Sequence, residues 1–181
     1  MNKMLKKFLA WDAKATIGMR IAEKPGLRRS LAVIFAHSGD SWFWLLALLV
    51  IWLASVAWRE RVIIMGLCIL ITALVVFTIK FTVRRKRPEG EWGAIYRKTD
   101  PHSFPSGHAT RALMLATIAL GLGPAWFSIL LLVWAPLVTL ARVAMGVHYL
   151  SDVIAGAFLG IALGGIYLAF LPSALNLLST F

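Results

Sequence analysis

The sequence predicts an all-α fold, namely a polytopic membrane bundle of about five to six transmembrane helices with an amphipathic interfacial helix in front of it. The chain is 60% apolar, whereas a soluble domain is typically about half apolar. These apolar residues are gathered in long uncharged runs, and a helix needs ~20 of them to cross a bilayer. Basic residues dominate the remaining segments and give a net charge of +11. Together these features predict a single membrane domain over residues 1–181.

Residues 1–40 are expected to form helical segments at the membrane surface. Met4, Phe8 and Trp11 recur at helical spacing, and the lysines between them fall elsewhere on the helical wheel. This pattern is typical of a basic helix in the interface, and a disordered basic tail is the alternative. Residues 27–37 are too short to span a bilayer, so they are expected to lead into the first span through a turn at 38–41.

Five uncharged runs predict the spans of the bundle, which is expected over residues 41–172. They cover roughly residues 42–58, 62–83, 106–122, 125–145 and 152–171. Because the chain changes face at each crossing, the polar segments near 84–88, 105–108 and 142–148 all return to one face. The sequence therefore predicts that three separate segments build one site on one side of the membrane.

Basic residues are strongly biased toward that same face, since Arg59 and Arg61 are the only lysines or arginines outside it. The positive-inside rule makes such a face cytoplasmic, which predicts a multi-pass protein of the inner (plasma) membrane. Cations that bind a ligand would give the same bias, so the opposite face is the alternative. Anionic lipid headgroups are the expected partner of these charges. Nucleic acid is excluded because the chain has no basic soluble domain.

The first polar cluster lies at the end of the second span. Lys80 and Arg87 sit about 20° apart on one helical stripe, on which Arg84 also falls. Pro88 then ends the helix. Cations on one stripe suit a phosphate ligand. Snorkelling of basic side chains to the interface is the alternative, and it is a fair interpretation for Arg85 and Lys86.

The second cluster, Pro105 to His108, precedes the third span. Ser106 is placed as the N-cap of a helix, and Gly107 lets the backbone approach a ligand closely. Backbone N–H groups at a helix start bind anions, and His108 projects from the first turn. An ordinary cap followed by an interfacial histidine is the alternative.

The third cluster combines an arginine with a histidine and an aspartate. Asp152 lies four residues after His148, which is one turn if the segment is helical, so it can accept the ring N–H, fix the tautomer and leave the other nitrogen free. Arg142, near the end of the fourth span, has a planar fork that suits phosphate oxygens. A structural His–Asp pair beside a snorkelling arginine is the alternative.

Together the three clusters resemble the signature of the type 2 phosphatidic acid phosphatase (PAP2) superfamily, and the surrounding segments look like small bacterial members. The signature is Lys-x6-Arg-Pro, then Pro-Ser-Gly-His, then Ser-Arg-x5-His-x3-Asp, and ten positions match it in order. The departure is Ala141, where the family often has serine. The missing hydroxyl predicts weaker phosphate anchoring at that point, with activity retained.

The resemblance implies a hydrolase that needs neither a metal nor a cofactor. In it His148 attacks phosphorus to form a phosphohistidine, Asp152 orients His148, and His108 protonates the leaving oxygen before it activates water. The phosphoryl oxygens would be held by Lys80, Arg87, Arg142, Ser106 and the N–H of Gly107. Arg84 would contact a second phosphate, which slightly favours a diphosphate, and binding of lipid headgroups is its alternative role.

A membrane enzyme with its site at the interface is expected to act on a lipid phosphate. The resemblance suggests phosphatidic acid, phosphatidylglycerol phosphate, polyprenyl diphosphates such as undecaprenyl diphosphate, or lipid A phosphate. A phosphotransferase with the same phosphohistidine and a lipid transporter without hydrolysis are the rival functions. Transporters place charge near the midplane of the membrane, whereas the charges here cluster at one face, which argues against a lipid transporter. Members acting on polyprenyl diphosphates and lipid A often work on the outer face, against the charge bias here.

The loop at residues 89–104 is expected to cover the site. Trp92 and Tyr96 suit the aromatic belt of the membrane interface. The acidic residues of the loop, Glu91 and Asp100 among them, are interpreted as groups that only solvate it. This interpretation leaves the loop without any direct role in binding.

A stripe of small residues marks the fifth span, where glycine recurs at positions 156, 160 and 164. Such stripes allow two helices to approach closely. We expect the stripe to pack within the bundle, and a homodimer is the alternative. The single cysteine, Cys68, lies inside the second span and is expected to serve packing alone.

Overall fold

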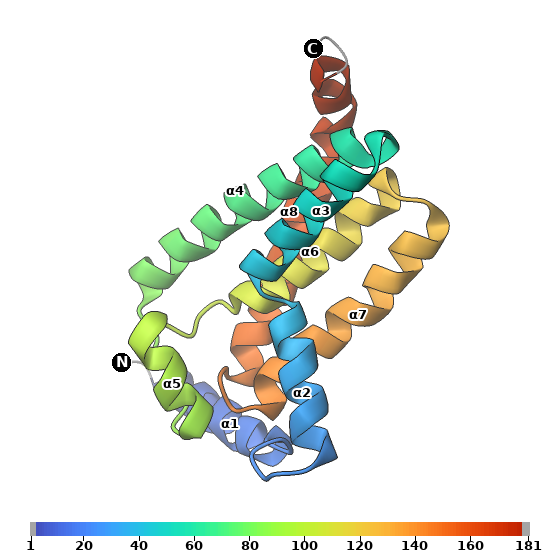
Figure 1. The fold of residues 1–181 in the computed structure, drawn as a ribbon. Coiled ribbons are helices and arrows are strands. Elements are labelled where there is room, and N and C mark those ends of the chain that lie inside the picture. Colours follow the sequence, from blue (N-terminus) through green and yellow to red (C-terminus); the bar gives the residue numbers. More distant parts are fainter. Residues whose placement is uncertain (1–2, 179–181) are drawn as a thin grey trace.

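The fold is all-α, as predicted, and forms a helix bundle (Figure 1). The computed structural model describes residues 3–178, apart from the side chains of residues 97, 174 and 176–178. In chain order the elements are α1 (Lys3–Met19), α2 (Leu27–Ser38), α3 (Ser41–Ala54), the 3-10 helix η1 (Val56–Trp58), α4 (Arg59–Val83), α5 (Glu91–Thr99), α6 (Gly107–Leu122), α7 (Ala125–Ala144) and α8 (Leu150–Leu178). In this part of the chain, extended pairing is limited to one isolated bridge between Lys86 and His102.

Helix α6 lies in the middle of the bundle, packed against α4, α7 and α8. Residues 109–112 are all buried, so every side of the helix faces protein near its start. The chain leaves α4 and α7 at the same end of the bundle at which it enters α6 and α8 (Figure 1). The three polar clusters therefore meet at one end, as the topology predicts.

Three helical segments are long and apolar enough to cross a membrane: Val56–Val83, Ala125–Ala144 and Leu150–Ser173. The pair α2 and α3, bent by 61° at the turn between them, would make a fourth span. The protein is thus a multi-pass membrane protein, but the described helices do not confirm five to six spans. The difference comes from α3 with 14 residues and α6 with 16, fewer than the ~20 of a straight crossing.

Helix α4 ends at Val83, earlier than the sequence suggests. Arg84 follows it as a C-cap in the left-handed conformation, with φ 52°. Pro88 disfavours helical backbone for the residue before it, so the helix cannot run on through Arg87. The prediction that Lys80, Arg84 and Arg87 share one helical stripe is therefore wrong, and Arg87 reaches the site from a loop.

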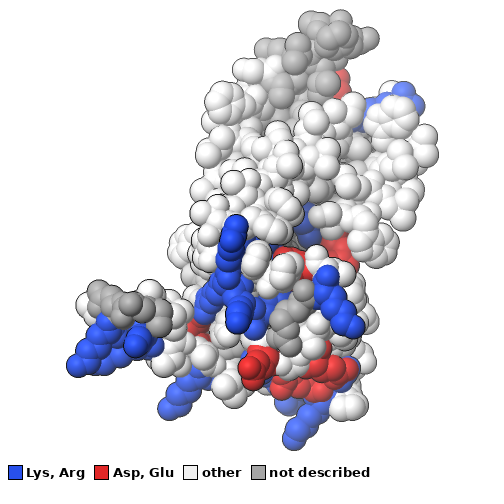
Figure 2. Space-filling model, turned by 90° about the vertical axis from the view of Figure 1, so that its left-hand side faces the viewer, with Lys and Arg blue, Asp and Glu red and all other residues white. Residues whose placement is uncertain are grey.

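Helix α1 lies at the charged end of the molecule (Figures 1 and 2). Figure 2 shows lysine and arginine gathered at this end, whereas the opposite half of the visible face carries few charges. Phe8 and Trp11 are exposed, while Asp12 is buried against the start of α8. Residues 3–19 are helical, which agrees with the amphipathic helix and contradicts a disordered tail. Helix α2 then leads into α3 through Gly39 and Asp40, as predicted.

The glycine stripe of α8 packs against α6, as predicted. A Cβ atom on Gly156 would lie 2.6 Å from the Ser106 carbonyl oxygen, and one on Gly160 would overlap the Thr110 carbonyl oxygen. Backbone atoms cannot move aside as a flexible side chain can, so glycine permits this approach of the two helices. The stripe is therefore used within the bundle and gives no support to a homodimer, which stays a prediction.

Replacing Gly160 by alanine should destabilise the bundle. The added methyl group would collide with the backbone of α6, and overpacking typically costs about 1–3 kcal/mol. Gly165→Ala is the matched control, because a Cβ atom there meets nothing within 4 Å and alanine favours a helix. Thermal unfolding in detergent should give a lower midpoint for Gly160→Ala only. Equal midpoints would contradict the close packing of α6 on α8.

Candidate active site

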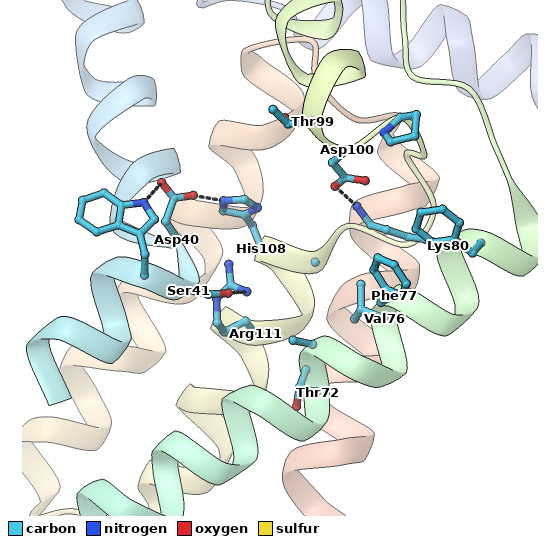
Figure 3. Close-up of a pocket in the computed structure, with 15 residues that line it drawn as sticks. Asp40, Ser41, Thr72, Val76, Phe77, Lys80, Thr99, Asp100, His108 and Arg111 are labelled. Carbon is cyan, nitrogen blue, oxygen red and sulfur yellow. Dashed lines mark hydrogen bonds and ion pairs between the residues drawn. The ribbon is translucent and has the colours of Figure 1, made fainter. Parts of the chain in front are cut away.

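A pocket of about 500 Å³ lies between α3, α4 and α6, and Lys80, Gly107 and His108 are the predicted site residues that line it (Figure 3). Polar side chains line one end of it, namely Asp40, Lys80, Asp100 and His108. Apolar side chains of α4, such as Phe77, line the adjoining wall. A ligand with a charged group attached to an apolar part would match both surfaces.

Three cations are buried at the charged end: Lys80, Arg87 and Arg142 are 6%, 3% and 0% exposed. Oδ2 of Asp100 accepts from Nζ of Lys80 and, at 2.7 Å, from Nη2 of Arg87. The ring of Tyr96 lies 5.4 Å from the guanidinium of Arg87 and 4.7 Å from that of Arg142. Segments far apart in the chain thus supply one patch of buried positive charge.

Arg142 keeps unused hydrogen-bond donors inside this patch. It lies in the last turn of α7, and its Nη1 donates to the hydroxyl of Tyr96 at 3.2 Å. Its Nε and Nη2 find no hydrogen-bond partner among the residues that the structure describes. Leaving a buried charged donor unpaired is costly, so a bound anion would stabilise this site. The planar fork suits the oxygens of a phosphate.

His148 follows α7 with one ring nitrogen turned to the cations. Its Nε2 lies 3.1 Å from Nη1 of Arg87, and because a guanidinium only donates, Nε2 accepts. Nδ1 therefore carries the proton. It lies 3.7 Å from Oδ2 of Asp152, which is too far for the predicted hydrogen bond, and it has no hydrogen-bond partner among the described residues. Burial and the charges of Arg87 and Arg142 lower the pKa of His148 well below its usual value. The imidazole is thus neutral, with its lone pair among buried cations.

Asp152 is held by groups other than its histidine neighbour. Its Oδ1 accepts from Nη1 of Arg85 at 2.7 Å, and its Oδ2 accepts from the backbone N–H of Tyr149 at 2.9 Å. Nη2 of Arg85 donates in turn to Oδ2 of Asp12 in α1 at 2.6 Å. The interpretation of Arg85 as a snorkelling side chain is therefore wrong, since it bridges two buried carboxylates. The charge of Asp12 within an apolar stripe was the sequence signal for this contact.

The second cluster caps α6 as predicted. Ser106 is the N-cap, and its side chain accepts from the backbone N–H of Ala109 at 3.5 Å. Gly107 and His108 line the pocket. Nε2 of His108 lies 2.6 Å from Oδ1 of Asp40, a residue of the turn between α2 and α3. Asp40 lies outside the three clusters, so their spacing gave no sign of this contact.

The acidic residues of segment 89–104 do more than solvate it, contrary to the sequence interpretation. Asp100 pairs with two buried cations of the site. Glu91 forms an ion pair with Arg29 of α2 at 3.0 Å. The segment folds into helix α5, which brings Tyr96 to the cations. It therefore takes part in the charge balance of the site as well as covering it.

The side chains of Arg84 and Ala141 form no hydrogen bond or ion pair with the buried cations in the described part of the chain. Arg84 is exposed, and its Nε donates to the carbonyl oxygen of Phe81 at 2.8 Å. Ala141 packs in an apolar cluster with Ala36 and Met145. A second-phosphate role for Arg84 and weaker phosphate anchoring at Ala141 thus stay predictions, which no contact between the described residues supports.

Comparison with known sequences shows the family of the chain. The family model of the PAP2 superfamily matches residues 61–174. A decaprenylphosphoryl-5-phosphoribose phosphatase of Mycobacterium tuberculosis is 32% identical over 148 residues, which cover 81% of each chain. An undecaprenyl-diphosphatase of Sulfolobus acidocaldarius is 44% identical over 63 residues, which cover 35% of this chain and 31% of that protein.

Solved structures show the same fold. The PAP2 type phosphatidylglycerolphosphate phosphatase from Bacillus subtilis gives a TM-score of 0.75 at 23% identity, over 92% of this chain and 87% of that one. LpxE of Aquifex aeolicus gives a TM-score of 0.68 at 26% identity, over 86% of this chain and 93% of that one. The bundle described here is thus similar to those of two membrane proteins of known structure.

Replacing Arg85 should destabilise the protein far more than replacing its neighbour Arg84. Arg85→Gln would leave Asp12 and Asp152 buried without their shared cation, and breaking a buried ion pair typically costs about 3–5 kcal/mol. Arg84→Gln changes an exposed side chain, for which the expected effect is within ~0.5 kcal/mol. Unfolding midpoints in detergent should separate the two variants by several degrees. If both variants unfold at the same temperature, Arg85 is not the bridge.

Proposed function

The chain belongs to the PAP2 superfamily and is a membrane phosphatase, and we propose that it hydrolyses a lipid phosphate through a phosphohistidine on His148, without a metal. One observation carries this proposal. The neutral Nε2 of a buried histidine lies among buried cations, and one of these, Arg142, has two guanidinium nitrogens without a partner in the described part of the chain. Such a site would receive a phosphoryl group and hold it against a nucleophile.

The proposed reaction has two steps. In the first, Nε2 of His148 attacks phosphorus while the bond to the leaving oxygen breaks, and protonated His108 gives its proton to that oxygen. Asp152 stabilises the positive charge that His148 gains. In the second, water attacks the phosphohistidine, His108 takes a proton from the water, and the P–N bond breaks. Phosphate leaves, and both histidines return to their starting states.

Side chains supply the positive charge for this reaction. The proposed ligands of the phosphoryl oxygens are Lys80, Arg87, Arg142, Ser106 and the backbone N–H of Gly107. Fixed cations and N–H donors stabilise the charge of a phosphoryl-transfer transition state, which is the task that a metal ion performs elsewhere. Within residues 3–178, no three His, Cys, Asp or Glu side chains that the structure describes are grouped to hold a metal ion.

The substrate we favour is a lipid whose polyprenyl chain carries the phosphate-bearing headgroup. Two relatives are named for decaprenyl and undecaprenyl lipids, and the first matches most of this chain. The apolar wall beside Lys80, which includes Phe77 and Phe81, suits a lipid tail. The positive-inside rule favours a site on the cytoplasmic face of the inner membrane. Impermeant labelling of a cysteine engineered into segment 89–104 on intact cells would decide the face.

His148→Ala should abolish phosphate release. Purified wild-type protein in detergent and EDTA should release phosphate from lipid phosphates, with the highest kcat/KM for polyprenyl-linked ones, and quenching should trap a phosphoenzyme on histidine. The variant should lose at least ~10³-fold in rate, because the nucleophile is gone. His102→Ala is the control and should retain activity, because the ring of His102 makes an edge-to-face contact with Phe81. Near-normal turnover by His148→Ala would refute the nucleophile, and inactivation by EDTA would refute metal independence.

Asp100→Asn should strengthen inhibition by inorganic phosphate. The carboxylate competes with phosphate for Lys80 and Arg87, and hydrogen bonds to charged groups are worth ~1.5–3 kcal/mol, so the inhibition constant should fall about 10-fold. Glu91→Gln is the matched control, because that carboxylate pairs with Arg29 instead. A higher inhibition constant for Asp100→Asn would mean that Asp100 positions the cations and does not compete for them.

A further inference from the structure

Asp40 stands at the N-cap of α3 but does not cap the helix. An aspartate in this position commonly accepts a hydrogen bond from a backbone N–H of the first turn. Here no side-chain cap bond forms, and the carboxylate turns to His108, with 2.6 Å between Oδ1 and Nε2. Its Oδ2 accepts from Nε1 of Trp42 at 3.2 Å and lies 3.0 Å from Nδ1 of His37. The orientation of Asp40 thus serves its histidine neighbours instead of the helix.

The turn that carries Asp40 is fixed to the helix that carries His108. Arg111, on the next turn of α6, donates from Nε to the Gly39 carbonyl oxygen at 2.9 Å and from Nη1 to Oγ of Ser41 at 2.6 Å. The turn lies so close to α6 that a Cβ atom on Gly39 would be 3.2 Å from Cδ2 of His108. Because Arg111 is itself buried, the carboxylate and the imidazole are held in one geometry.

This contact decides which nitrogen of His108 can exchange a proton with a ligand. Asp40 takes Nε2, so the exchanging nitrogen is Nδ1. Figure 3 shows the ring between Asp40 on one side and the Lys80–Asp100 pair on the other. A carboxylate that pairs with Nε2 stabilises the protonated imidazole, and it fixes the tautomer of the neutral imidazole. An acid that later acts as a base needs both effects.

We propose that Asp40 is the positioning carboxylate of His108, so that the site holds two histidine–carboxylate pairs, one for the nucleophile and one for the acid. The inference rests on the proposed function, in which His108 protonates the leaving group. When Nδ1 of His108 gives its proton to the leaving oxygen, the neutral ring keeps its Nε2–H on Asp40. The proton from water later returns to Nδ1. Asp40 stays ionised throughout and acts on the reaction only through His108.

Asp40→Asn is the direct test, because asparagine keeps the shape and an accepting oxygen but removes the charge. With a lipid monophosphate that the wild type hydrolyses, kcat should fall about 10- to 100-fold while KM changes less than about 3-fold, since the alkoxide leaving group needs a proton. His37→Ala is the matched control: it removes another contact of Asp40 and leaves the pair with His108 intact. His37 is exposed, so this variant should keep most of its activity.

A double-mutant cycle separates positioning from a merely structural role. In the His108→Ala background, Asp40→Asn should cause no further loss of kcat, because a positioning residue acts only through its partner. Additive losses, or an unchanged kcat in the single variant, would overturn the inference. A different result would contradict the proposed function, namely wild-type turnover by His148→Ala or by His108→Ala. If both histidine variants are inactive and Asp40→Asn has the wild-type kcat, only the inference about Asp40 is overturned.

Discussion

The burial of three like charges in one small space is the constraint on which the rest of the structure depends. Lys80, Arg87 and Arg142 are each at most 6% exposed. Cations removed from water need carboxylates or hydrogen bonds to offset the lost hydration. Asp100 bridges two of them, and the carbonyl oxygen of Val147 accepts from Arg87 at 2.9 Å. The places of α5 and of the α7–α8 turn follow from this need, because each brings an acceptor to the cations.

The carboxylate behind the proposed nucleophile needs support of its own. Asp152 is fully buried, and Arg85 joins it to Asp12, which is fully buried as well. Asp12 also accepts from the backbone N–H of Ser151 at 2.9 Å, so α1 is docked on the first turn of α8. The amphipathic helix therefore completes a chain of charges that reaches from the N-terminus to His148, besides presenting apolar side chains at its surface.

Features that depend on neighbouring residues could be predicted from the sequence, whereas partners from distant segments could not. The N-cap at Ser106 is local and is present. The spacing of His148 and Asp152 is also local and brings Nδ1 to 3.7 Å from the carboxylate, although His148 lies before the first residue of α8. Asp40 meets His108 across 68 positions and Asp100 meets Lys80 across 20, and neither aspartate belongs to a periodic pattern. Apolar runs located the helices, but whether α3 and α6 cross the bilayer depends on the helices that surround them.

In the proposed mechanism, exchange of one anion for another would allow this buried site to bind a phosphate. His148 is 1% exposed and Asp100 holds two of the cations, so a phosphate would reach the nucleophile by taking the place of that carboxylate. The cations are already out of water in the free protein, so the ligand does not have to offset their dehydration. A phosphate monoester carries up to two negative charges, whereas the Asp100 carboxylate carries one. The phosphate can also accept from the donors of Arg142 that have no partner among the described residues. A neutral headgroup would leave Lys80 and Arg87 without an anion, so the proposed displacement of Asp100 would select for phosphate.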